Sequence, residues 1–167
     1  MRAWDLISFP ASRDQKEEDT MVRVMTAEDY DQVYALWMSI KGFGIRSIDD
    51  SREGIERFLK RNPTTSCVAV EDGKIVGAIL CGHDGRRACM YHVCVSSDYR
   101  RRHIGQHMVD FCLKELEKEK ICKVALNAFV TNEAGNAFWQ KMGWILRNDM
   151  NYYDHVIDAD NITIFNE

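Results

Sequence analysis

The chain has 167 residues, of which 46% are hydrophobic and two are proline. This length and composition suit one globular domain with a substantial core, and they leave too little chain for two. A formal net charge of −4 argues against a nucleic-acid partner. No apolar run reaches the roughly 20 residues that a membrane span needs, so no membrane partner is expected.

Residues 1–20 are predicted to be a flexible extension that precedes a single domain over residues 21–167. Residues 11–20 are polar and charged, with no usable hydrophobic period. The first residues carry one arginine and a short, interrupted apolar run, which makes a poor signal peptide. Six cysteines without a C-x-x-C pair indicate reduced thiols, and together these features favour a cytoplasmic protein.

The domain is predicted to begin with a strand, a helix, a loop and a second helix. Val22 and Val24 alternate with a polar residue, and Thr26 is a suitable N-cap for the first helix. The loop over residues 41–50 combines glycines with apolar side chains, which is typical of loops that line a ligand site. The second helix is expected to stop before Pro63.

Two hairpins follow in the prediction. Two apolar runs flank Asp72-Gly73, a dipeptide that favours a tight turn between strands. The turn over residues 84–87 then leads into a further strand. This part of the sheet should therefore be antiparallel.

A strand, a basic loop and a helix occupy residues 91–116. Alternation predicts a strand as far as Val95, and a helical period begins at Ile104. The apolar face of that helix contains Ile104, Met108, Val109, Cys112, Leu113 and Leu116. The free N–H groups at the helix N-terminus suit a phosphate, and Gly105 lets a diphosphate approach the backbone. A solvated arginine run and a nucleic-acid patch are the alternative interpretations.

The remaining chain completes an α/β (α+β) fold. Residues 123–129 form a predicted strand, joined in parallel to the strand before the central helix. A short helix is expected over residues 133–141, and residues 144–165 are expected to form a hairpin or two short strands. The prediction is a mixed, mostly antiparallel sheet with helices on both faces.

Two segments carry a family resemblance. The segment VCVSSDYRRRHIG, residues 93–105, resembles the acetyl-coenzyme A (acetyl-CoA) signature of the GNAT superfamily of N-acetyltransferases. That signature, Arg/Gln-x-x-Gly-x-Gly/Ala, maps to Arg100, His103 and Gly105, with histidine in place of the first glycine. A positive φ would carry a strain cost for His103. Residues 132–144 are similar to the family's Asn-x-x-Ala-x-x-Leu-Tyr-x-x-x-Gly-Phe, and the nearest resemblance is to the subgroup of ribosomal-protein N-terminal acetyltransferases.

The resemblance implies acetyl-CoA as co-substrate, no metal, and a splayed parallel strand pair that holds the cofactor. A bulge in the first strand of that pair would free an N–H for the thioester carbonyl. Asn132 would bond the pantetheine amides, although a plain N-cap is the alternative role for this residue. The expected cofactor-binding residues are Val93, Cys94, Val95, Arg100, Arg101, Arg102, His103, Ile104, Gly105, Gln106, Asn132, Gly135, Asn136, Phe138 and Trp139.

The catalytic residues are less well defined, because Trp139 stands where the family has a tyrosine. An indole N–H donates a hydrogen bond but does not transfer a proton near neutral pH. The candidate bases are Asp84, His92 and Tyr91, and the candidate acids are Tyr91, Tyr152, Tyr153 and water. A histidine in a strand is more often a packed or surface residue than a catalytic one.

The resemblance implies an N-acetyltransferase that moves the acetyl group of acetyl-CoA to a primary amine by direct attack in a ternary complex. The acceptor is either a small-molecule amine or a protein N-terminus, and acids such as Asp49, Asp50 and Asp84 would suit a cationic one. A non-catalytic acyl-CoA-binding module is the alternative. The sequence leaves open whether the chain forms a homodimer.

Overall fold

The computed structural model describes residues 20–167, so the extension predicted over residues 1–20 lies outside the described part except for Thr20. The strands of the main sheet are β1 (Met21–Val24), β3 (Cys67–Glu71), β4 (Lys74–His83), β5 (Ala88–Val95) and β6 (Val124–Leu126). The helices are α1 (Tyr30–Met38), α2 (Arg52–Arg61), α3 (Ile104–Lys118) and α4 (Glu133–Lys141). Two short strands, β2 (Gly44–Arg46) and β7 (Thr163–Phe165), form a separate pair.

The main sheet has the strand order β1-β3-β4-β5-β6. The first three pairings are antiparallel and the last, between β5 and β6, is parallel. The parallel connection runs through α3, which gives the crossover that the sequence predicted. The mixed, mostly antiparallel sheet is confirmed.

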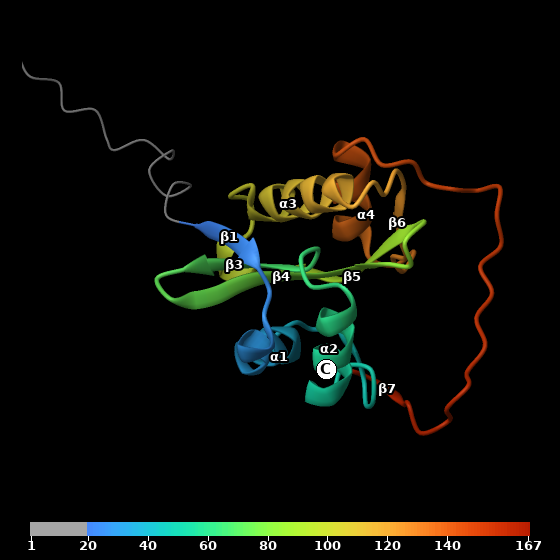
Figure 1. The fold of residues 1–167 in the computed structure, drawn as a ribbon, viewed down its shortest axis with the longest axis horizontal. Helices are drawn as coiled ribbons and strands as arrows, with labels where there is room; N and C mark the ends of the chain where they lie inside the picture. Colours follow the sequence, from blue (N-terminus) through green and yellow to red (C-terminus); the bar gives the residue numbers. More distant parts are fainter. Residues whose placement is uncertain (1–19) are drawn as a thin grey trace, which may run out of the picture.

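Helices cover both faces of this sheet, with α3 and α4 on one face and α1 and α2 on the other (Figure 1). The first core lies under α3, whose buried residues are Ile104, Met108, Val109, Cys112 and Leu116. The second core lies under α1 and α2 and surrounds Trp37, which is fully buried. β3 and β4 are buried against both cores, which explains their nearly continuous apolar sequences.

Leu113, which the sequence places on the apolar face of α3, is 36% exposed and lies at the margin of that face. The strand expected over residues 123–129 is also shorter, since β6 ends at Leu126 and Phe129 is exposed. In the described part of the chain, none of the helices is long and apolar enough to cross a membrane.

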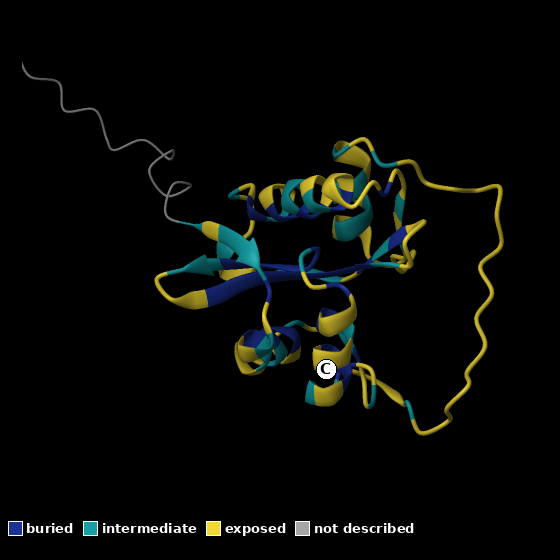
Figure 2. Ribbon diagram, in the orientation of Figure 1, coloured by how far each residue is buried: buried dark blue, intermediate teal, exposed yellow. Residues whose placement is uncertain are grey.

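The prediction of a hairpin or two short strands over residues 144–165 is wrong as well. β7 is the one strand in this segment, and it pairs antiparallel with β2 instead of with a neighbour in the segment. The preceding residues leave α4, arc away from the body and return on the α1–α2 side (Figure 1). Figure 2 shows that this arc is exposed almost throughout, so its apolar residues are not packed against the main sheet within residues 20–167.

Candidate active site

The site is organised around one open strand edge. β5 pairs with β6 only from Ala88 to Met90, because β6 ends at Leu126, the residue that pairs with Met90. The next five residues of β5, Tyr91–Val95, have no ladder partner on that side within residues 20–167. Their backbone therefore offers the donors and acceptors of an incomplete sheet to an extended ligand.

A bulge interrupts β5 at this open edge. Leu80 pairs with Tyr91 and Ala78 pairs with Cys94, so two residues of β5 face the single residue between them on β4. His92 lies in the bulge with a φ of 50°, the left-handed region that few residues other than glycine adopt. The distortion turns the strand away from its regular ladder at the middle of the open edge.

The loop after β5 forms a cradle of backbone N–H groups. Arg101 and His103 have φ values of 62° and 57°, and such alternation of handedness curls successive N–H groups into an anion-binding concavity. The N–H groups of residues 104–106, in the first turn of α3, have no partner inside the helix, because the first helical bond runs from His107 to His103. The cradle and the helix N-terminus together suit a diphosphate. The positive φ at His103 is a conformation that glycine adopts readily and that carries a strain cost for histidine.

The three arginines of this loop differ in what they contact. Arg100 donates from Nε to the carbonyl oxygen of Val95 at 3.2 Å, at the end of the open edge. Arg102 is held by Glu71 of β3, with 2.6 Å between Nη2 and Oε2. Arg101 is exposed. Arg102 therefore stabilises the loop against the sheet, while Arg100 and Arg101 lie at the surface of the cradle.

Helix α4 lies close to the cradle. A Cβ atom added to Gly105 would lie 3.4 Å from Cζ of Phe138, which shows how closely α4 packs against the start of α3. Trp139 is half-buried, and its ring lies 5.0 Å from Phe138 and 4.7 Å from Trp144. Asn132 caps the helix by accepting the Gly135 N–H at 3.0 Å, as the N-cap interpretation expected.

A buried histidine–carboxylate pair lies behind the bulge. Nε2 of His92 is 2.7 Å from Oδ1 of Asp50, and the two side chains are 10% and 5% exposed. The other oxygen of Asp50 accepts the Arg46 N–H at 2.7 Å. The His92 ring also contacts Trp37 and Phe43, at ring distances of 4.7 and 4.9 Å. The bulge is thus tied to the loop between α1 and α2.

Sequence reasoning finds both members of this pair but not their contact. In the sequence, Asp50 is only one of several acids suited to a cationic acceptor. It is separated from His92 by 42 positions, and no local pattern links a loop acid to a strand histidine. The sequence contains one indirect indication of this contact, namely that a loop predicted to line a site and a histidine in the central strand occur in the same domain.

The other candidate catalytic residues lie in different surroundings. Tyr91 packs edge-on against Phe58, and burial, together with the thiol of Cys89, raises the pKa of Tyr91 to about 12. Asp84 lies in the exposed turn before β5, where it accepts the N–H groups of Arg86 and Arg87. Those bonds lower its pKa.

Tyr152 and Tyr153 lie on the exposed C-terminal arc. Tyr152 makes a minor contribution to the raised pKa of Tyr91. No cluster of three or more histidine, cysteine or acidic side chains that could bind a metal occurs among residues 20–167.

The second short sheet lies beside this region. β7 pairs with β2 in the α1–α2 loop, and the ring of Phe165 on β7 lies 5.8 Å from that of Phe129, in the segment after β6. The contact between these two aromatic rings therefore joins β7 to the segment that follows β6. The sequence did not predict this contact, because Phe129 and Phe165 lie in segments that were expected to form separate strands.

Comparison with known proteins adds to this geometry. The sequence model of the acetyltransferase (GNAT) family matches residues 30–144. An acetyltransferase of Sodalis glossinidius, SG1711, is 29% identical over 129 residues, which cover 77% of this chain and 89% of that relative.

Two solved structures share the fold. The PaiA N-acetyltransferase of Thermoplasma acidophilum, solved with coenzyme A, has a TM-score of 0.67 at 15% identity and covers 86% of this chain and 96% of its own. A ribosomal-protein-alanine N-acetyltransferase of Brucella melitensis has a TM-score of 0.64 at 18% identity and covers 82% of this chain and 99% of its own.

Proposed function

The chain belongs to the acetyltransferase (GNAT) family, and on that basis we propose that it transfers the acetyl group of acetyl-CoA to a primary amine. The observation that carries the proposal is the open edge of β5 over Tyr91–Val95, which ends at a cradle of N–H groups. An extended pantetheine arm would pair with that edge as an added strand, and the diphosphate would lie on the first turn of α3.

The reaction needs the thioester carbonyl to be polarised where negative charge develops. In the proposed complex an N–H group freed by the bulge at His92 donates to that oxygen. Such a donor is already oriented before the reaction, so it can contribute a large share of the rate enhancement. Holding donor and amine together in one ternary complex supplies the remaining orientation for direct attack.

We assign the general base to His92, oriented by Asp50. A carboxylate only accepts hydrogen bonds, so Nε2 of a neutral His92 carries the proton and Nδ1 holds the lone pair. The side chain is 10% exposed, so it would take the amine proton through a water molecule. Asp84 is a weaker candidate, because its carboxylate is bound to its own turn.

The leaving thiolate requires a proton from another group. Trp139 cannot supply it. Tyr91 remains protonated well above neutral pH, because its pKa is about 12, and Tyr153 or Tyr152 would have to approach from the C-terminal arc. Direct protonation by water is the remaining route.

The acceptor we propose is a cationic amine, either a protein N-terminus or a small molecule. The loop that carries Asp49 and Asp50 borders the bulge, and one structural neighbour is a ribosomal-protein-alanine N-acetyltransferase. Another is an aminoglycoside acetyltransferase, so both classes of amine belong in the assay.

The test is thiol release from acetyl-CoA with a panel of peptide N-termini, polyamines and aminoglycosides. Asp50→Asn should lower kcat by about 10²–10⁴-fold, because the amide can donate to Nε2 and so moves the proton to Nδ1. His92→Asn should give a similar loss, and asparagine tolerates the positive φ of the bulge.

Asp84→Asn is the matched control and should leave turnover unchanged, since an asparagine oxygen can still accept the two turn N–H groups. Tight acetyl-CoA binding without turnover of any amine would favour the non-catalytic acyl-CoA-binding module. Equal turnover in wild type and Asp50→Asn would remove the His92–Asp50 pair from the mechanism.

A further inference from the structure

Residues 145–158 form an exposed strap between α4 and β7. Seven large apolar side chains of the strap are between 61% and 96% exposed. They are Ile145, Leu146, Met150, Tyr152, Tyr153, Val156 and Ile157. Folded domains seldom leave a contiguous set of this size in water, and such sets commonly mark an interface.

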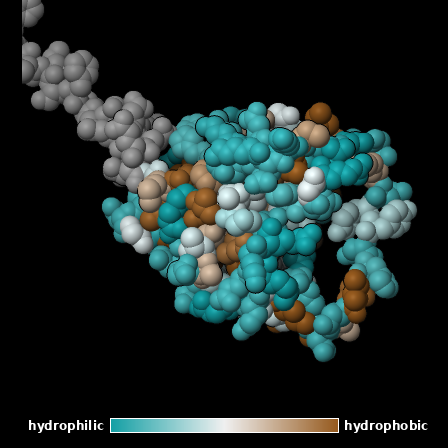
Figure 3. Space-filling view, in the orientation of Figure 1, coloured by the Kyte–Doolittle hydropathy of each residue, from teal (hydrophilic) through white to brown (hydrophobic). Residues whose placement is uncertain are grey.

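Both ends of the strap are fixed to the body of the same chain. Before it, Trp144 packs against Trp139 of α4. After it, Asn161 accepts the N–H of Ile48, and β7 pairs with β2. Figure 3 shows an opening between the strap and the body, so the strap does not pack closely against its own chain in this arrangement.

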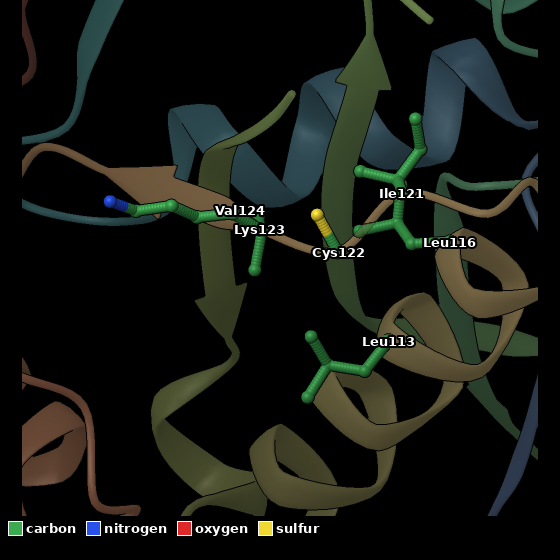
Figure 4. A pocket seen from close by; sticks show the side chains of 6 residues that line it. All are labelled: Leu113, Leu116, Ile121, Cys122, Lys123 and Val124. Carbon is green, nitrogen blue, oxygen red and sulfur yellow. The ribbon is translucent and has the colours of Figure 1, made fainter. Parts of the chain in front are cut away.

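A surface that could receive the strap lies at the edge of the main sheet. β6 is the last strand, and among residues 20–167 no strand pairs with its outer side. Next to it, a hollow of about 120 Å³ lies between the end of α3 and the start of β6. Figure 4 shows its lining, which is Leu113, Leu116, Ile121, Cys122, Lys123 and Val124. The hollow explains why Leu113 is exposed although it lies beside the apolar face of α3.

The charges of the strap and of this edge are opposite. The strap contains Asp149, Asp154 and Asp158 against one arginine, which gives a net charge of −2. Residues 118–124 contain three lysines against one glutamate, which gives +2. Complementary charge of this kind favours correct pairing of surfaces and faster association.

We propose that two copies of the chain associate reciprocally, the strap of each lying on the β6 edge and hollow of the other. Strap and receiving edge belong to the same sequence, so a two-fold arrangement satisfies both copies at once. Seven side chains that bury on the order of 100 Å² each would remove about 700 Å² of strap surface, close to the roughly 800 Å² per partner of a stable interface. The proposal does not depend on the transferred group or on the acceptor.

The competing arrangement is closure of each strap onto its own chain. Arg147 holds the pKa of Asp149 at about 2, and Lys123 of the same chain contributes to that shift. Attraction between the strap and the β6 edge is therefore expected in both arrangements. They differ in oligomeric state, because closure gives a monomer and reciprocal association gives a dimer.

Charge reversal separates the two arrangements by sedimentation or light scattering of the full chain. One variant carries Lys120→Glu with Lys123→Glu, and the other carries Asp149→Lys with Asp154→Lys. In a pair made of either variant alone, the strap and the receiving edge carry charges of the same sign at both contacts. Each variant should therefore sediment as a single chain, whereas the wild type should sediment as a dimer. An equimolar mixture should regain the mass of two chains, because both contacts are then matched.

Ile157→Asp tests the apolar part of the contact, and Met38→Asp on α1 is its matched control. Ile157 is 96% exposed, so its replacement should leave the fold intact and abolish the pair, while the control should remain paired. A wild type that remains a single chain throughout the micromolar range would overturn the proposal. So would a pair that survives Ile157→Asp, or two reversal variants that stay single when mixed.

Discussion

Two regions of this chain contain many apolar residues, and these residues are buried in one region and exposed in the other. β3, β4 and β5 are rich in valine, isoleucine, alanine and cysteine, and most of their residues are buried between the two helical layers. The C-terminal segment, residues 144–165, also contains many apolar, β-branched and aromatic residues, interspersed with aspartate and asparagine, yet Ile157 is 96% exposed. Apolar composition thus indicates that a segment needs a partner, but the strand itself forms only where a ladder and a covering layer are available.

The largest expected effect contrasts one substitution in the two regions. Ile79→Ala on β4 should lower the free energy of unfolding by about 2–5 kcal/mol, because Ile79 is completely buried and its loss leaves a cavity. Ile157→Ala should change it by less than about 0.5 kcal/mol in dilute protein. Denaturant unfolding of both variants at the same low concentration makes the comparison.

A concentration series provides the control. If a second copy covers the strap, the Ile157→Ala penalty should increase with protein concentration, and the Ile79→Ala penalty should not. A large penalty for Ile157→Ala in dilute protein would mean that the strap packs against its own chain, and the contrast between the two regions would then be wrong.

The same contrast explains how much the sequence could predict. The short helix expected over residues 133–141 is present with those bounds, because its N-cap Asn132 and its terminal Gly143 are local signals. The hairpin around Asp72-Gly73 and the start of α3 at Ile104 were also predicted correctly. In each case the pattern, the cap and the burial agree.

What could not be predicted depends on contacts between distant residues. The pairing of β7 with β2 joins segments that lie more than a hundred residues apart, and neither carries a turn that would align them. The contact between His92 and Asp50 requires the bulge, whose position follows from the register of β4 and β5. The cofactor residues were inferred from a motif, so their role stays a prediction until binding is measured.

The second prediction concerns the open edge, where a ligand would supply the missing ladder partner. Acetyl-CoA at about a hundredfold over its Kd should stabilise the chain by about 2.7 kcal/mol. Gly105→Val should remove most of that gain, because its side chain would enter the space near Phe138, where even a Cβ would lie 3.4 Å away. Thermal shifts with and without acetyl-CoA measure both quantities.

Gly105→Ala is the graded control, since a single methyl group at this position makes ordinary contacts and should cost less affinity than valine. Unliganded Gly105→Ala should melt near the wild type and unliganded Gly105→Val somewhat lower, because its branched side chain crowds Phe138, so the quantity compared is the shift in melting temperature on adding acetyl-CoA. A wild type whose melting temperature does not respond to millimolar acetyl-CoA would contradict the assignment of the cradle.

A smaller effect is expected at Trp139, at the boundary between the ordered core and the strap. Trp139→Ala should weaken acetyl-CoA binding by about tenfold, corresponding to the loss of one aromatic wall. Trp139→Tyr should keep the affinity and speed thiol release, because a phenol can donate the proton that indole cannot. Trp144→Ala, which removes the neighbouring indole ring that lies tilted against Trp139, is the control. Unchanged affinity in Trp139→Ala would place this residue away from the sulfur.

The smallest effect is predicted at the other end of the chain, where a truncated protein that starts at Met21 should melt within a degree or two of the full chain and bind acetyl-CoA equally well. Residues 11–20 of the segment it lacks are polar and charged and have little apolar surface to bury, and the apolar run in residues 1–10 is short and interrupted. Its one described residue, Thr20, donates a hydrogen bond to Glu71 at 2.7 Å, and Glu71 keeps its ion pair with Arg102 when that bond is lost. A bond of this kind contributes about 0.5–1.5 kcal/mol when buried and less at a partly exposed site.

Thr20→Ala in the full chain isolates that contribution, so the truncated protein and Thr20→Ala should have equal melting temperatures. A truncated protein that is clearly less stable than Thr20→Ala would show that residues 1–19 contact the domain.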